Sequence, residues 1–154
     1  MQIQQESRPY DEIKLAYAAG YFDGEGTVNV LSCKGNFQLR VELTLYDLDS
    51  LLVFEELFGG KVRSDEFAAV NFRVYRWAKN NRDAIGVLSA MVPFLRAKKK
   101  QAELARDSGW DFQTRGGPRL TEFQIERRAA LHRALKEAKK DNKREKSPRS
   151  VKLK

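Results

Sequence analysis

The chain has 154 residues, of which 42% are apolar and 32% are charged, and this is enough to bury the core of one domain. Its longest mostly apolar stretch, residues 13–22, contains Lys14 and is far shorter than the roughly 20 residues that a membrane span needs. The first residues lack the basic start and apolar stretch of a secretion signal, so we expect an intracellular, non-secreted protein without membrane contact.

The cysteine and histidine content excludes two further classes. One cysteine, Cys33, cannot form a disulfide within the chain. Together with one histidine, His132, it also cannot supply the Cys/His cluster of a zinc site. Any bound metal is therefore expected on carboxylates.

The net charge of +8, from 29 basic and 21 acidic residues, points to nucleic acid or another polyanion as the partner. Most of this charge comes from residues 139–154, where eight basic residues stand beside two acidic ones. A block of this composition is equally typical of a solubilising, poorly ordered end. Net charge alone therefore does not establish a function.

The first part of the chain predicts a helix followed by a hairpin. Asp11 is a suitable N-cap for a helix over residues 12–23, which ends near Gly24 and Gly26. Alternating apolar and polar residues then predict two strands, over residues 27–30 and 37–46, with a turn at 34–36.

The next part repeats this order. Asp49 is predicted to cap a short helix over residues 50–58, and strands over 61–64 and 70–77 are predicted to pair around Asp65 and Glu66. Asp83 begins another helix, and Pro93 is expected in the first turn of its continuation over 93–106, because an interior proline would break the helix. The predicted fold is an α+β domain over residues 1–107 with the order αββαββα.

The C-terminal part predicts a linker over residues 108–120, a helix over 121–140 and a flexible basic tail over 141–154. Thr121 and Gln124 have the spacing of a capping box at the start of this helix. Its apolar stripe, which we expect to dock on the body of the protein, consists of Leu131, Ala134, Leu135 and Ala138.

The first helix differs from an ordinary amphipathic helix because apolar residues surround it, so we expect it to be buried nearly all round. Four residues at three- and four-residue spacing make a flat face where another backbone can approach: Ala16, Ala19, Gly20 and Asp23. A second copy of the helix, related by a twofold axis, would fit this face. A central helix packed inside a monomer is an equally compatible alternative.

This helix ends in Asp23-Gly24-Glu25-Gly26, which places two carboxylates at the negative end of the helix dipole. If two such helices cross, two Glu25 carboxylates and nearby glycine carbonyls meet, giving a hard oxygen site suited to Mg²⁺. The four residues alone are weak evidence, because Asp and Gly are also ordinary turn residues.

Residues 18–26, with the sequence AAGYFDGEG, resemble the motif that names the LAGLIDADG homing endonucleases. The identities fall at Ala19, Gly20, Asp23 and Gly26, and Glu25 replaces the second Asp of the motif. The order αββαββα is also that family's core. Residues 93–102 resemble the segment that brings a basic residue to the family's active site, with Lys98 as the best match, so the resemblance spans about residues 10–106.

The resemblance implies the roles of four residues. Glu25 becomes the metal ligand from each of two subunits, with the Gly24 carbonyl beside it, and the metal is Mg²⁺ or Mn²⁺. Lys98 becomes a cation near the scissile phosphate, although a solvated helix face is its structural alternative. Asp47 falls where the family often has a polar residue that orders water.

The resemblance also assigns the polar faces of the two hairpins to the DNA major groove, which admits a two-stranded ribbon. An ordinary solvent-facing sheet would look similar. The residues assigned to base contacts are Asn29, Gln38, Arg40, Glu42, Thr44, Arg63, Asn71, Arg73 and Tyr75.

The function that we expect is that of a metal-dependent homing endonuclease, a homodimer that cuts both strands of a long pseudo-palindromic DNA site, as in intron homing. One alternative is a non-cleaving relative, either an RNA-splicing maturase or a DNA-binding regulator. Another is a basic scaffold or ribosome-associated module, in which residues 23–26 would be a mere turn. Ala18 in place of the motif's Leu, the short helix after Asp47 and the basic extension after Gly117 depart from the family pattern.

Overall fold

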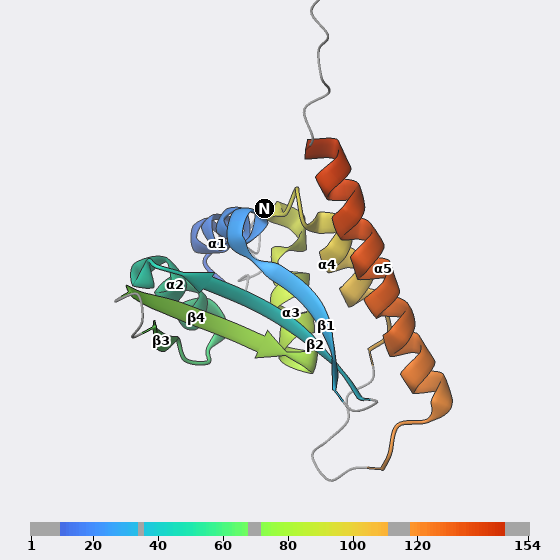
Figure 1. Cartoon of the computed structure of the whole chain (residues 1–154). Helices are drawn as coiled ribbons and strands as arrows, with labels where there is room; N and C mark the ends of the chain where they lie inside the picture. The colour runs from blue at the N-terminus through green and yellow to red at the C-terminus, as the bar shows by residue number, and fades with distance from the viewer. Residues whose placement is uncertain (1–9, 34–35, 68–71, 111–117, 147–154) are drawn as a thin grey trace, which may run out of the picture.

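The computed structural model describes residues 10–33, 36–67, 72–110 and 118–146. Along the chain its elements are α1 (Glu12–Glu25), β1 (Thr27–Cys33), β2 (Asn36–Leu45), α2 (Leu48–Phe58), β3 (Arg63–Phe67), β4 (Phe72–Asn80), α3 (Asn81–Met91), the 3-10 turn η1 (Val92–Phe94), α4 (Lys99–Arg106) and α5 (Glu122–Lys146) (Figure 1). The predicted order αββαββα is confirmed through α3. None of the helices in the described ranges has the length and apolar composition that a membrane span requires.

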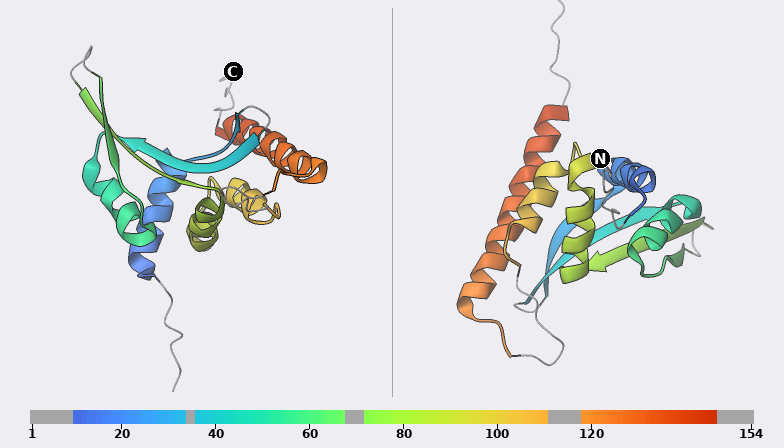
Figure 2. Two further views of the ribbon diagram at one scale, coloured as in Figure 1. Left: turned by 90° about the horizontal axis from the view of Figure 1, so that it is seen from below. Right: turned by 180° about the vertical axis from the view of Figure 1, so that it is seen from behind.

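The four strands form one antiparallel sheet in the order β1-β2-β4-β3, so the second strand of each hairpin lies at the centre. Across this centre Leu43 pairs with Trp77, and Thr44 pairs with Arg76. Directly opposed residues point to the same side of a sheet, and successive residues alternate. The sheet therefore has an apolar face containing Leu43 and Trp77 and a polar face containing Thr44 and Arg76. The helices cover the first face and leave the other open and concave (Figure 2, left).

The core lies between α1, α2, α3 and the apolar face of the sheet. Phe22 of α1 and Phe54 of α2 are fully buried in it together with Trp77 of β4. The rings of Phe54 and Trp77 are 5.2 Å apart, and the Trp77 indole N–H donates to the Gly59 carbonyl oxygen over 3.0 Å. This fixes α2 against the centre of the sheet.

Three local predictions were wrong in their boundaries. Asp47, not Asp49, caps α2, because its carboxylate accepts from the Asp49 backbone N–H over 3.0 Å and from the Ser50 hydroxyl. Asp65 and Glu66 lie within β3, opposite Val74 and Arg73, and not in the hairpin turn. The turn predicted at 34–36 falls partly at residues 34–35, outside the described residues, and Asn36 already belongs to β2.

The predicted helix over residues 93–106 is also interrupted. The 3-10 turn η1 ends at Phe94, Leu95 is extended, and α4 begins only at Lys99. The cause is a contact far away in sequence. The backbone N–H groups of Arg96 and Lys98, which would otherwise belong to a helix, donate to the Asp23 carboxylate.

Helix α5 begins at the predicted capping box. The Thr121 backbone N–H donates to Gln124 Oε1 over 2.8 Å, and the Gln124 N–H donates to Thr121 Oγ1 over 3.2 Å. The predicted apolar stripe docks on the body through Leu131, Leu135 and Ala138, which are buried. The helix continues past residue 140 to Lys146.

Helix α5 runs along the exposed edge of β1 and forms hydrogen bonds to one backbone carbonyl of β1 and one of β2. His132 Nδ1 donates to the Val30 carbonyl oxygen over 2.8 Å, and the Arg128 guanidinium donates to the Phe37 carbonyl oxygen over 3.1 Å. The Arg128 guanidinium also lies over the ring of Trp110, 4.6 Å from its centre. An edge strand with unpaired backbone groups invites unwanted pairing, and α5 covers this one.

Candidate active site and nucleic-acid interface

The motif residues form the end of α1. The helix stops where the Gly26 N–H donates to the Phe22 carbonyl oxygen over 2.8 Å, and the chain then turns into β1 in an extended conformation. A Cβ atom at residue 26 would overlap the Phe22 ring, whereas residues 20 and 24 have no atom within 4 Å of that position. The last glycine of the motif is therefore required by core packing and the other two are not.

Asp23 joins the end of α1 to the segment before α4. Its carboxylate accepts from the Arg96 backbone N–H over 2.6 Å and from the Lys98 backbone N–H over 2.9 Å. The Lys98 ammonium group in turn donates to the Asp23 carbonyl oxygen. Asp23 thus holds the helix end within its own chain, and its place in the contact with a second copy stays a prediction.

Glu25, the last residue of α1, is exposed and lies two residues beyond Asp23 in the helix that Lys98 contacts. The structure therefore brings the predicted metal ligand and the predicted active-site cation to the same end of α1. Carboxylate and carbonyl oxygens at Glu25 and Gly24 are hard ligands of the kind that Mg²⁺ prefers. Within the described ranges no group of three or more acidic, His or Cys residues is close enough to hold a metal.

One stripe of α1 is exposed, so the single chain does not by itself bury this helix all round. Ile13 and Tyr17 keep 83% and 48% of their surface, and Gly20 and Gly24 continue the same line at helical spacing. Of the four residues predicted for the dimer interface, Gly20 lies on this stripe and Ala16 is half-buried beside it. Ala19 is fully buried in the chain's own core, so its prediction was wrong.

Asp47 uses both carboxylate oxygens at the start of α2. These hydrogen bonds, first the one from Ser50, lower the pKa of Asp47 below its usual range. Its described contacts are those of an N-cap, and a role in ordering water stays a prediction.

The open polar face of the sheet carries most of the residues predicted to contact bases. Cross-strand pairing places Asn29 opposite Arg40 and Thr44 opposite Arg76. Cross-strand pairing places these polar and charged residues, among others, on this face, in chain order: Asn29, Gln38, Arg40, Glu42, Thr44, Arg63, Asp65, Arg76 and Asn80. Asn71 lies outside the described residues.

Arg73 and Tyr75 were assigned to the wrong side of β4. Tyr75 pairs with Leu45 and packs against the hydrophobic core, and alternation puts Arg73 on the same side. Arg76, which the pattern missed, lies on the open face instead. The signal was Trp77, because the largest apolar side chain of the strand must be buried, and counting back from it gives the correct alternation.

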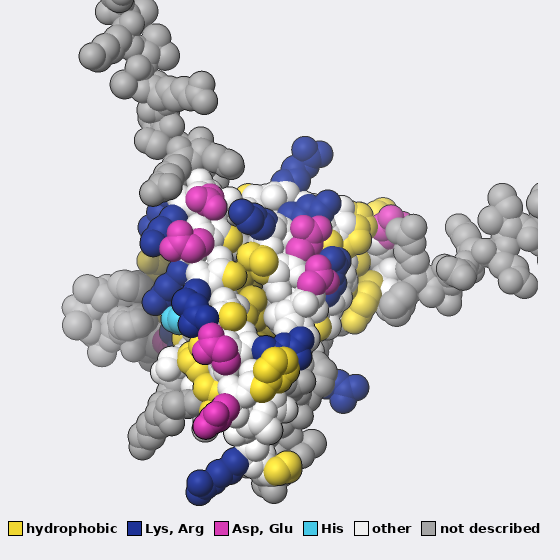
Figure 3. All heavy atoms as spheres, turned by 90° about the vertical axis from the view of Figure 1, so that its right-hand side faces the viewer, with side chains coloured by type: hydrophobic (Ala, Val, Ile, Leu, Met, Phe, Trp, Pro, Cys, Tyr) yellow, Lys and Arg dark blue, Asp and Glu magenta, His cyan; other side chains and the backbone are white. Residues whose placement is uncertain are grey.

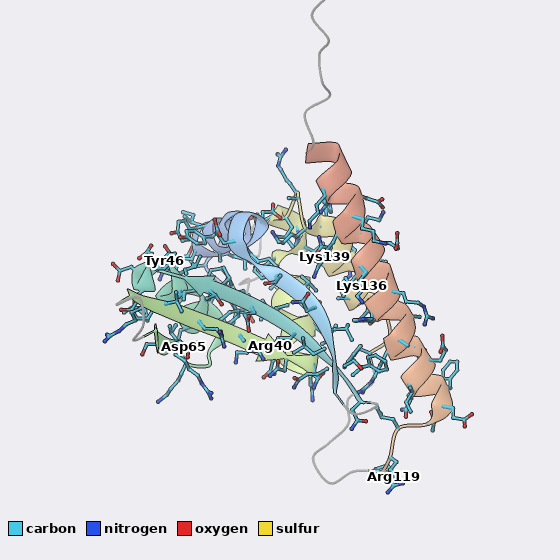
Figure 4. All side chains as sticks on the ribbon, in the orientation of Figure 1. Arg40, Tyr46, Asp65, Arg119, Lys136 and Lys139 are labelled. Atoms are coloured by element: carbon cyan, nitrogen blue, oxygen red, sulfur yellow. The ribbon has the colours of Figure 1, made fainter. Side chains whose placement is uncertain are left out.

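Ion pairs on the open face partly neutralise its charges. The Arg40 guanidinium lies 2.6 Å from the Glu42 carboxylate, and the Arg76 guanidinium lies 3.2 Å from that of Asp65. Figure 4 shows Arg40 and Asp65 on the sheet and Lys136 and Lys139 on α5, beside β1. The concave face therefore combines amide, hydroxyl and guanidinium groups, which is the mixture that reads base edges, with cations at its α5 side.

The outer side of the molecule, formed by α4 and α5, is different. Basic and acidic side chains are mixed there (Figure 3). Exposed ion pairs join Lys100 to Asp141 and Lys140 to Glu137. The basic excess of the C-terminal part is therefore not a uniform basic stripe along α5.

No protein family model and no curated protein matches the sequence. Among solved structures, the archaeal intron-encoded homing endonuclease I-Vdi141I, complexed with DNA, matches over 86% of this chain and 86% of its own, with 17% identity and a TM-score of 0.59. Two structures of the homing endonuclease I-CvuI with targets, in calcium and in magnesium, match over 62% and 63% of this chain. The match spans just under two thirds of those chains, 65% and 66%, with 20% and 17% identity and TM-scores of 0.49 and 0.50. The fold of this chain, with its αββαββα order and the motif at the end of α1, is that of the LAGLIDADG homing endonucleases.

Proposed function

We propose that this protein is a site-specific endonuclease that cuts double-stranded DNA as a homodimer. The observation that carries the proposal is the exposed stripe of α1, which leads from Ile13 through Gly20 to Gly24, next to Glu25. Lys98 contacts the same end of the helix. Two copies joined along this stripe would bring two Glu25 carboxylates together between two concave sheets. The neighbours I-Vdi141I and I-CvuI, homing endonucleases bound to DNA, support the same class of substrate.

The chemistry of the site fits phosphodiester hydrolysis. Glu25 and the Gly24 carbonyl would hold Mg²⁺ or Mn²⁺, which supplies activation of water and stabilisation of the attacking and leaving oxygens. Lys98 would place its ammonium group near the phosphate that is cut, where it stabilises developing negative charge. Asp23 positions Lys98 by fixing the backbone of residues 96–98. Each copy would serve one strand of the duplex.

The open face of the sheet would lie in the major groove, since a curved antiparallel sheet can follow the groove while the helices stay on the far side. A twofold axis through the α1 pair makes the two half-sites of the DNA alike, so we expect a pseudo-palindromic target.

The test of this proposal is Glu25→Gln. The amide keeps the shape of the side chain and removes the charge that holds the metal, so Mg²⁺-dependent cleavage of a plasmid library with randomised inserts should fall about a hundredfold or more. Binding of the same DNA in Ca²⁺ should persist. Glu12→Gln, the same change at the opposite end of α1, is the matched control and should cut as the wild type does.

The outcomes separate the alternatives. A wild-type protein that binds the library but never cuts it in Mg²⁺ or Mn²⁺ would be a non-cleaving DNA-binding regulator. Undiminished cutting by the Glu25→Gln protein would refute Glu25 as the ligand.

A further inference from the structure

Helix α5 forms one wall of a small, open cavity beside the proposed active site. The cavity has a volume of about 230 Å³ and lies where the start of β1, the segment before α4 and the last turns of α5 meet. Its polar lining consists of Thr27, Lys98, Gln101, Lys139, Asn142 and Lys143. Thr27 follows Glu25 and Gly26 directly, so the cavity adjoins the end of α1.

The lysine side chains of Lys98 and Lys139 both line this cavity. Lys98 donates to the Asp23 carbonyl oxygen and Lys139 to the Asn29 amide oxygen. Burial, and then the positive charge of Lys98, lowers the pKa of Lys139. Where the chain is described, no carboxylate pairs with Lys139, whereas its neighbour Lys140 pairs with Glu137 on the outer side of the same helix. A half-buried cation beside a second cation is costly, and an anion between them would offset that cost.

The cavity is built by tertiary contacts and not by one loose side chain. Asn142 Nδ2 donates to the Ala97 carbonyl oxygen over 2.7 Å, which ties α5 to the segment that carries Lys98. Gln101, only 4% exposed, has an Oε1 atom without a partner among the described residues. Because amide oxygen and nitrogen are assigned from their surroundings, rotation of this amide would offer Nε2 as a further donor to an anion.

We propose that this cavity seats a backbone phosphate of the bound DNA, and that Lys139 of α5 acts with Lys98 as its second cation. A phosphate carries one negative charge and several acceptor oxygens, and ammonium groups bind it as point charges. The hydrogen bond to Asn29 links Lys139 to the open face of the sheet. A DNA strand lying on that face would therefore pass the cavity near the end of α1, where Glu25 lies. The identification of this phosphate as one from DNA rests on the proposed function. Helix α5 would then complete the cleavage centre as well as cover the edge of β1.

The test uses three variants of the full chain. Lys139→Met keeps most of the stem and removes the charge, Lys139→Arg keeps the charge, and Lys140→Met is the matched control on the outer side of α5. The first probe is inorganic phosphate, titrated against protein carrying ¹³C-labelled lysine side chains. Phosphate should shift the Lys98 and Lys139 signals together and raise the pKa of Lys139. Lys139→Met should abolish the response of Lys98, and Lys140→Met should leave it unchanged.

The second probe is a random-sequence duplex in Ca²⁺. Lys139→Met should weaken binding about 5- to 10-fold and reduce the slope of log K against log salt by about 0.9 for each phosphate that is no longer neutralised. Lys139→Arg should restore most of the affinity. The melting temperature of Lys139→Met should not fall, because the change removes a poorly compensated charge. A purely structural role for Lys139 would instead lower it and leave the salt slope unchanged.

These results distinguish failure of this assignment from failure of the proposed function. If the variants bind phosphate and duplex as expected but the wild type never cuts DNA, the phosphate site is supported and the endonuclease proposal fails. If the wild type cuts and Glu25→Gln does not, while Lys139→Met binds phosphate and duplex as the wild type does, the phosphate site is refuted and the endonuclease proposal stands. Equal losses of phosphate and duplex binding in Lys139→Met and Lys140→Met would also refute the phosphate site.

Discussion

The three glycines of the α1 motif differ in what surrounds them. Residue 26 has an ordinary extended backbone, so it does not need glycine for its conformation. It needs glycine for space, because the Phe22 ring occupies the volume that a Cβ atom would take. Phe22 is fully buried and cannot move without disturbing the core.

Gly26→Ala should therefore destabilise the folded chain by about 1 to 3 kcal/mol, the usual cost of overpacking a core. For a chain of this size such a loss corresponds to a fall of a few degrees or more in melting temperature, measurable by calorimetry. Gly24→Ala is the control: its Cβ atom meets nothing within 4 Å, so the melting temperature should stay the same or rise slightly. Equal stability of the two variants would show that Phe22 does not pack on residue 26.

Local pattern predicts Glu25, and the family resemblance predicts Lys98, as candidate site residues, but neither indicates which carboxylates already form hydrogen bonds within the chain. Asp47 hydrogen-bonds within its own helix start, a role for which aspartate is well suited. Asp23 bonds backbone groups of residues 96 and 98, a contact that no spacing in the sequence could reveal. The same contact explains why the continuous helix predicted over residues 93–106 is broken before Lys99.

Both hairpins were predicted, but only for the first could the two faces be assigned from the sequence, for a physical reason. In β2, Leu39, Val41, Leu43 and Leu45 alternate strictly with polar residues, so both faces follow from the pattern. In β4 the alternation is ambiguous, because Val74 lies on the open face outside the hydrophobic core cluster while Tyr75 packs against the core. Only the pairing with β2 and β3, which depends on the tertiary structure, decides which face of the sheet each β4 side chain lies on.

The orientation of β4 makes Arg76, and not Arg73, the candidate for base contact on this strand. Arg76→Ala should weaken binding of the preferred duplex by about 1 to 3 kcal/mol and relax preference at one position of each half-site. The measurement is selection from a randomised duplex pool in Ca²⁺, compared with the wild type. Arg73→Ala removes the same charge from the other side of the same strand and should leave the preferred sequence unchanged. Altered preference in Arg73→Ala with none in Arg76→Ala would reverse this assignment.

The sequence predicted helix α5 but not the position at which it docks. Its capping box and apolar stripe correctly predicted a helix that docks on the body. They could not show that the helix would lie beside β1, because the groups that it binds are the backbone carbonyls of Val30 in β1 and Phe37 in β2, and backbone carbonyls occur in every sequence. The position of Lys139 beside Lys98 follows from that docking.

At the scale of the whole molecule, a single copy offers half of what the proposed reaction needs. It has one Glu25, one concave sheet and one exposed α1 stripe on which Ile13 and Tyr17 stand beside the open space around Gly20 and Gly24. Large apolar residues next to glycine gaps suit a close crossing with an identical helix, since side chains of one copy can enter the gaps of the other. Self-contact of this stripe implies a twofold axis.

Gly20→Leu tests this arrangement. A side chain at residue 20 meets nothing within 4 Å in the single chain, so the fold of each copy should survive. At a close helix crossing the same side chain has no room, and overpacking of about 1 to 3 kcal/mol at each of two symmetric sites should raise the dissociation constant of the dimer strongly. Gly86→Leu, at an exposed helical glycine of α3 that is equally free of neighbours, is the matched control and should remain dimeric.

Sedimentation and cleavage should change together in this experiment, because each proposed active site needs the opposing helix. Double-strand cutting by the Gly20→Leu protein should fall as the dimer dissociates, and its residual activity should rise with protein concentration as mass action restores the pair. The Gly86→Leu protein should show neither effect. A Gly20→Leu protein that stays dimeric and cuts normally would place the contact between copies elsewhere. A wild-type protein that is monomeric both free and on DNA would mean that the α1 stripe serves another partner and that each active site is complete within one chain.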